Sequence, residues 1–81
     1  MIGLGKIMDR YKNLGGHSGI AYYQIGSDSI KVKFLDGDSY LYTYASAGME
    51  NIEYMKQLAK SGHGLNTFIS KNVRKRYEKS D

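Results

Sequence analysis

Tyrosine rings recur at every second position of one short run, YLYTY, at residues 40–44. Alternate residues of a β-strand point to the same side of a sheet, so these tyrosines form a single row if the run is a strand. The preceding run, IKVKFL, carries Lys31 and Lys33 two residues apart. Aromatic rings can stack on the bases of single-stranded nucleic acid, and neighbouring cations can neutralise its phosphates. Such a row can also be half-buried core with its hydroxyls at the edge.

The turn between the two runs decides between these interpretations, because a slip of one residue exchanges the two faces of a strand. The dipeptide Asp-Gly at 36–37 is typical of a two-residue type I′ hairpin turn. That turn pairs Lys33 with Tyr40 and Lys31 with Tyr42. Lysines and tyrosines then share one face and form a stacking platform.

A three-residue loop over 35–37, with its glycine in the left-handed bulge position, gives the opposite arrangement. Val32 then lies opposite Tyr40 and Ile30 opposite Tyr42, which makes one apolar face. We favour this second geometry, because a domain of 81 residues needs every large apolar side chain for its core. The intervening Leu, Thr and Ala residues would make a poor inner face.

A basic segment, KNVRKRYEK, follows at residues 71–79, where five cations face only Glu78. The net charge of the chain is +4, and a basic end on a small domain suggests an anionic partner. The alternative is a solvated helix face that keeps the protein in solution. With the strand residues, the candidate nucleic-acid contacts are Lys31, Lys33, Tyr40, Tyr42, Lys71, Arg74, Lys75, Arg76 and Lys79.

Catalytic and metal-binding patterns are weak in this sequence. Cysteine is absent, and the two histidines, His17 and His63, lie in glycine-rich loops with no carboxylate at a telling spacing. We therefore predict no enzymatic activity, no metal site and no cofactor. No apolar run approaches membrane-spanning length, so we expect a cytoplasmic protein without a membrane partner.

The periodicity along the chain predicts the elements that must position these residues. Alternating β-branched and aromatic residues predict strands at 20–25, 30–35 and 40–45. Apolar residues at spacings of three and four predict a helix from a Ser46 cap to a stop at Gly62, and a last helix over 67–77. Arg76 falls on the apolar side of that last helix, so either the helix frays before it or its guanidinium has a specific partner.

The fold class expected is therefore α+β: a three-stranded antiparallel β-meander followed by two helices, with a short N-terminal helix within 2–14. We divide the chain into an N-terminal helical extension and linker over 1–17, an α+β domain over 18–77 and a tail over 78–81.

Two segments, IKVKFLDGDSYLY at 30–42 and LAKSGHGLNTFISKNVRKRY at 58–77, resemble the KTSC domain. The resemblance covers residues 18–77, and two segments depart from the family pattern: ASAG stands where the family has Val-Pro, and GLNTF replaces an aromatic-Asn segment. The positions that match are Ile30, Val32, Phe34, Gly37, Tyr40, Tyr42, Ala59, Ser61, Gly62, Val73, Arg74 and Tyr77. This family is a short module at the C-terminus of some lysyl-tRNA synthetases and alone in small bacterial and phage proteins.

The residues and the resemblance together predict a small accessory binding module. RNA is the first partner expected, bound through the basic C-terminal helix and the Tyr-x-Tyr strand. The alternative is a protein-interaction or assembly domain that binds another protein or a second copy of itself through its tyrosines, methionines and an open strand edge.

Overall fold

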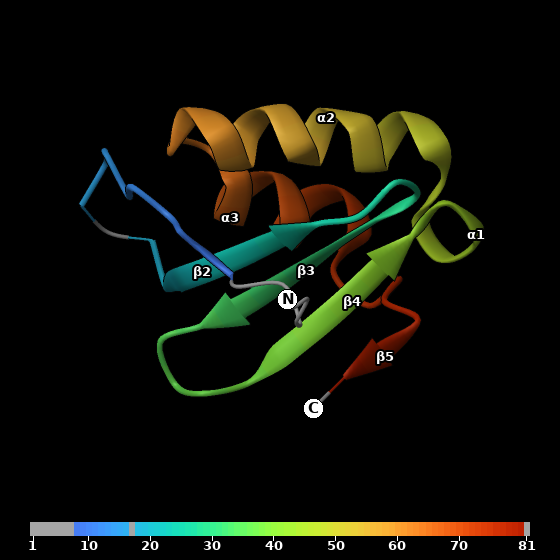
Figure 1. The fold of residues 1–81 in the computed structure, drawn as a ribbon, viewed down its shortest axis with the longest axis horizontal. Coiled ribbons are helices and arrows are strands. Elements are labelled where there is room, and N and C mark those ends of the chain that lie inside the picture. The colour runs from blue at the N-terminus through green and yellow to red at the C-terminus, as the bar shows by residue number, and fades with distance from the viewer. Residues whose placement is uncertain (1–7, 17, 81) are drawn as a thin grey trace, which may run out of the picture.

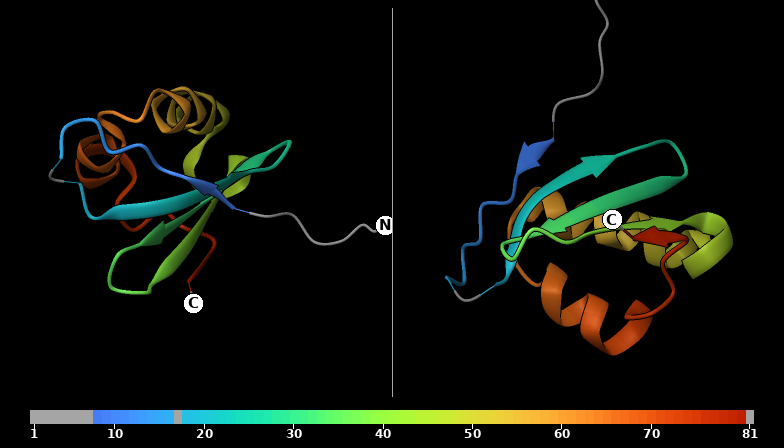
Figure 2. Two further views of the ribbon diagram at one scale, coloured as in Figure 1. Left: turned by 60° about the vertical axis from the view of Figure 1, so that its left-hand side comes forward. Right: turned by 90° about the horizontal axis from the view of Figure 1, so that it is seen from below.

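The computed structural model describes residues 8–16 and 18–80 and has an α+β fold. An antiparallel sheet of five strands, in the order β1-β2-β3-β4-β5, carries the helices on one face (Figures 1 and 2). In chain order the elements are β1 (Asp9–Arg10), β2 (Ile20–Ile25), β3 (Ser29–Phe34), β4 (Ser39–Thr43), α1 (Tyr44–Ala47), α2 (Met49–Ser61), α3 (Leu65–Phe68), the π-helical turn η1 (Ile69–Val73) and β5 (Lys79–Ser80).

The three predicted strands are present as β2, β3 and β4, but the predicted sheet was too small by two strands. β1 pairs with β2, and β5 pairs with β4, so both outer strands come from segments that we placed outside the central domain. The predicted N-terminal helix was wrong over 8–14, where the chain forms β1 and then a segment without regular structure that leads into a turn at Asn13. The rest of that predicted helix, at 2–7, lies outside the described residues.

The β3–β4 hairpin has the three-residue loop. The Phe34 N–H donates to the Asp38 carbonyl at 2.8 Å, and Gly37 has φ of +102°, the positive-φ conformation that glycine adopts at little cost. Val32 lies opposite Tyr40, as the apolar alternative predicted. The lysines of β3 therefore point to the other face of the sheet.

The core lies between this apolar sheet face and the helices. Ile30 and Val32 of β3 and Ile52 and Met55 of α2 are fully buried, and Tyr42 is 1% exposed. Burying side chains of this size contributes about 1.5–3 kcal/mol each. The core is thus built from the residues that strand alternation and helical periodicity assign to the inner faces.

The first helical segment begins earlier than predicted. Thr43 caps α1 by accepting a hydrogen bond from the Ser46 N–H at 3.1 Å, and the Ser46 hydroxyl accepts one from the Thr43 N–H at 3.0 Å. Ser46 is therefore the third helical residue of a capping box and not the N-cap of α2. Gly62 ends α2 in the left-handed conformation, as predicted.

The last helix is shorter than predicted. It begins at Leu65, widens into η1 and ends at Val73. Of the two alternatives given for Arg76, the structure thus has the one in which the helix ends before this residue. The Arg76 N–H then donates to the Val73 carbonyl at 2.7 Å. Beyond this turn the chain is extended and reaches the edge of β4 (Figure 1).

Candidate nucleic-acid interface

A groove lies between the sheet, the last helix and the C-terminal segment that follows this helix, and we name it the tyrosine groove. Its volume is about 340 Å³. Rings from two strands and the C-terminal segment meet polar groups of the last helix there. The residues that line it are Phe34, Asp36, Tyr40, Tyr42, Asn66, Ile69, Ser70, Arg74, Lys75 and Tyr77.

Aromatic rings form one wall of the tyrosine groove. The centroids of Tyr40 and Tyr77 lie 4.8 Å apart with the rings tilted by 47°, and the Phe34 ring meets Tyr40 edge-on at 5.8 Å. Such pairs stabilise each other by about 0.5–1.5 kcal/mol beyond their burial. Tyr77 is 37% exposed and Tyr40 is partly exposed, so part of this wall faces solvent.

Tyr42 has a different role from Tyr40. Its ring is buried, and its hydroxyl donates to the Arg74 carbonyl at 3.3 Å. Burial, reinforced by the neighbouring Tyr40 and Tyr77, raises the pKa of the Tyr42 hydroxyl to about 12. Tyr42 is therefore a neutral core residue that fixes the C-terminal segment, and it offers no free face for stacking.

Hydrogen bonds to β4 hold the C-terminal segment that brings Tyr77 to the groove. The Glu78 N–H donates to the Leu41 carbonyl at 2.7 Å, and the Thr43 hydroxyl donates to a Glu78 carboxylate oxygen at 2.7 Å. The second bond is charge-assisted and so stronger than a neutral one. Glu78 thereby serves as an anchor, although it is the acidic member of an otherwise basic segment.

Two cations, Arg74 and Lys75, lie at the rim of the groove and are exposed. The ion pair between Lys56 and Glu53 lies on α2 and involves neither of these cations. The carboxylate of Asp36 lies on the groove wall and accepts a hydrogen bond from the Asp38 N–H at 3.0 Å. The groove thus presents two cations and stackable rings, with one anion nearby.

The structure divides the nine predicted contact residues between several surfaces. Tyr40, Tyr42, Arg74 and Lys75 meet in the tyrosine groove. The three lysines at 31, 33 and 79 lie on the opposite face of the sheet, as their pairing partners require. Lys71 borders a separate hollow beside Phe68, and exposed Arg76 is not among the groove residues.

Sequence analysis did not assign Asn66 and Ser70 to the site. With Arg74 they recur at four-residue spacing, so the last helix places them on one stripe next to its buried row of Ile69 and Val73. That polar stripe was a usable signal in the sequence.

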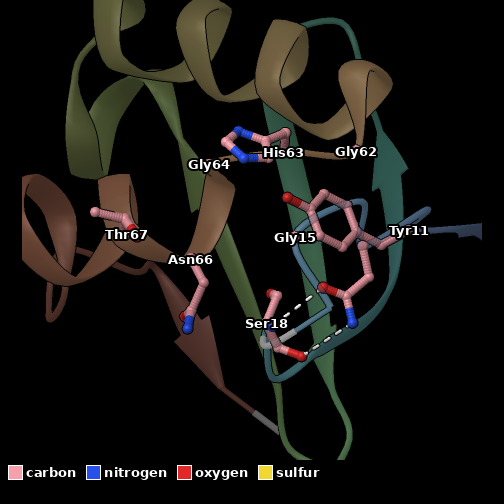
Figure 3. Close-up of a pocket in the computed structure, with 9 residues that line it drawn as sticks. Tyr11, Gly15, Ser18, Gly62, His63, Gly64, Asn66 and Thr67 are labelled. Carbon is pink, nitrogen blue, oxygen red and sulfur yellow. Dashed lines mark hydrogen bonds between the residues drawn. The ribbon is translucent and has the colours of Figure 1, made fainter.

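A second, smaller pocket of about 190 Å³ lies between the N-terminal segment and the loop after α2 (Figure 3). Asn13 accepts a hydrogen bond from the Ser18 N–H at 3.0 Å, and the Tyr11 hydroxyl accepts one from the Leu65 N–H at 3.3 Å. Figure 3 shows the His63 ring at the top of the pocket, with no carboxylate among the labelled residues. These hydrogen bonds join the segments that surround the pocket to one another.

In the described ranges 8–16 and 18–80, no three His, Cys, Asp or Glu side chains cluster as a metal site needs. No helix of the same ranges is long and apolar enough to cross a membrane. Comparisons with models of known families, with curated proteins and with solved structures found no match to this chain.

Proposed function

We propose that this protein is a small accessory module that binds single-stranded RNA in the tyrosine groove. The observation that carries the proposal is the pair of rings, Tyr40 and Tyr77, at 4.8 Å beside the exposed cations Arg74 and Lys75. An unpaired base can stack on a ring, and the cations can neutralise the adjoining phosphates. A duplex keeps its bases paired and internally stacked, so the groove favours single strands.

The resemblance to the KTSC domain supports the same proposal. Five of the positions that carry it line the tyrosine groove: Phe34, Tyr40, Tyr42, Arg74 and Tyr77. These residues come from β3, β4 and the C-terminal segment, which are distant in the sequence. The association of that family with lysyl-tRNA synthetases makes RNA the first anion to test, and binding rather than catalysis is the activity proposed.

The test is fluorescence anisotropy with labelled single-stranded and duplex RNA across a range of salt. We expect the wild-type protein to prefer the single strand and Tyr40→Ala to weaken its binding by roughly tenfold, because stacking contributes about 1–3 kcal/mol per base. Tyr40→Phe keeps the ring and should bind nearly as well. Tyr54→Ala removes a 49% exposed tyrosine on α2, outside the groove, and is the matched control.

Two outcomes would contradict the proposal. Equal, salt-sensitive binding to both RNAs that is indifferent to Tyr40 would indicate a generic basic surface. Absence of binding even at low salt would remove RNA as the partner and favour the alternative, a protein-interaction domain. Circular dichroism of each variant establishes that Tyr40→Ala still folds.

A further inference from the structure

The tyrosine groove is lined by charges of both signs that do not pair with each other. The Asp36 side chain lines it from the turn between β3 and β4, and the Arg74 side chain lines it from the position that follows η1. Both residues are described by the structure and exposed, and no ion pair joins them. The groove, with a volume of about 340 Å³, therefore has a carboxylate and a guanidinium on its walls, both of which can bind a ligand.

The Asp36 carboxylate keeps free hydrogen-bonding capacity beside its contact in the turn. Its Oδ1 accepts a hydrogen bond from the Asp38 N–H at 3.0 Å, a contact typical of aspartate and asparagine in turns. Its Oδ2 accepts no hydrogen bond from the residues that the structure describes. An ionised carboxylate only accepts hydrogen bonds, so this wall favours a ligand edge that carries donors side by side.

The Arg74 guanidinium has the opposite preference. It is a planar fork of N–H donors without an acceptor, so it favours a ligand edge that carries acceptors side by side. The carbonyl of the same residue accepts the hydrogen bond from the Tyr42 hydroxyl at 3.3 Å, which holds its backbone against β4. The side chain is exposed at the groove rim.

The four RNA bases differ in the order of donors and acceptors along their edges. Guanine carries N1–H and the N2 amino group next to each other on one edge, and O6 and N7 next to each other on another. Adenine and cytosine present a donor next to an acceptor, and uracil has its N3–H between two carbonyl oxygens. Guanine is therefore the base that offers a donor pair to a carboxylate and an acceptor pair to a guanidinium.

We propose that the tyrosine groove selects guanine. The Asp36 carboxylate accepts hydrogen bonds from N1–H and the N2 amino group, and the Arg74 guanidinium donates to O6 and N7. The base stacks on the ring wall of Tyr40 and Tyr77, and Lys75 supplies the contact to the adjoining phosphate. This inference rests on the proposed function and adds base specificity to it.

The experiment measures fluorescence anisotropy of labelled pentanucleotides of uridine whose middle base is uracil, guanine, adenine or hypoxanthine. All of them carry the same phosphates, so the ratio of two affinities reports the contacts of the middle base. We expect the wild-type protein to bind the guanine oligonucleotide about tenfold more tightly than the adenine one, as is typical of a bidentate contact to the correct base. Hypoxanthine lacks the N2 amino group, and its affinity should lie between these two.

Asp36→Asn should abolish the preference for guanine over adenine. Asparagine keeps the acceptor for the Asp38 N–H, but it replaces the acceptor-only carboxylate by one acceptor and one donor group. Asp38→Asn makes the same charge change two residues further on, at an exposed position that does not line the groove, and is the matched control. Removal of a negative charge strengthens phosphate binding in both variants, so the ratio of guanine to adenine affinity is the readout.

The outcomes separate this inference from the proposed function. Equal affinities for guanine and adenine in the wild type, with Tyr40→Ala still weakening both, would overturn the selection of guanine and leave the groove. A preference that Asp36→Asn retains, or that Asp38→Asn loses equally, would overturn the role of Asp36. Binding that is absent, or indifferent to Tyr40, would overturn the proposed function and with it this inference. A preference lost in Asp36→Asn alone supports both.

Discussion

The burial of Tyr42 gives a quantitative prediction about the stability of the protein at alkaline pH. The pKa of the Tyr42 hydroxyl rises from its ordinary value of 10.0 to about 12 because the ring is buried. In the unfolded chain the hydroxyl ionises near its ordinary pKa. A group whose pKa is raised on folding stabilises the protein below its unfolded pKa, and this stabilisation is lost as pH rises toward the folded pKa.

The magnitude follows from the size of the pKa difference. A full shift of two units corresponds to about 2.7 kcal/mol, and at pH 11, midway between the two pKa values, about 1.4 kcal/mol of it has been lost. Tyr42→Phe has no hydroxyl to ionise. At pH 8 it lacks the hydrogen bond to the Arg74 carbonyl, which contributes about 1 kcal/mol. The variant should be less stable than the wild type at pH 8 and about equally stable at pH 11.

Urea unfolding at the two pH values, followed by circular dichroism, measures this difference directly. The two proteins differ only in the Tyr42 hydroxyl, so the comparison of the variant with the wild type isolates the effect of this group. A stability gap of the same size at pH 8 and pH 11 would refute the reasoning, because Tyr42 would then ionise as readily in the folded protein as in the unfolded chain.

Two further predictions concern how the fold is closed around the sheet. Gly62→Ala should destabilise the protein by about 1–3 kcal/mol in urea unfolding, because a Cβ there comes 2.5 Å from the Cβ of Lys12. Gly16 has the same φ of +79° but open space around it, so Gly16→Ala measures the backbone cost alone. Equal losses of stability in the two variants would contradict the clash with Lys12. Lys56→Met should lower the free energy of unfolding by about 1–2 kcal/mol in the same assay, because it removes the donor to the Ser27 carbonyl at 3.0 Å and the partner of Glu53 at 2.7 Å. Unchanged stability would show that water replaces both contacts.

The central hairpin was predictable because few local choices were open. Alternation fixed the two strands, and the turn dipeptide left only two registers. The need for core then favoured the register that the structure has, with Val32 opposite Tyr40. That register also determines the sheet face of Lys31 and Lys33, so the sequence was sufficient to place them on the face opposite the tyrosines.

The outer strands were not predictable from local pattern. β1 and β5 are two residues each, Asp9–Arg10 and Lys79–Ser80, and two residues cannot display an alternation. They form strands because the edges of β2 and β4 offer backbone hydrogen-bonding groups to whichever segment lies beside them. Their pairing depends on which segment the tertiary fold places beside each edge, and a short stretch of sequence does not carry that information.

The end of the last helix explains why the site was only partly predicted. A helix continued through Tyr77 would keep that ring on the buried row of Ile69 and Val73 and would turn Arg76 toward the same apolar side. Burying an unpaired guanidinium is costly, so the helix ends at Val73 instead. The extended chain that follows carries Tyr77 across to Tyr40 and leaves the neighbouring cations at the groove rim. The mismatch at one arginine in the helical pattern therefore accounts for both the early helix end and the formation of the groove.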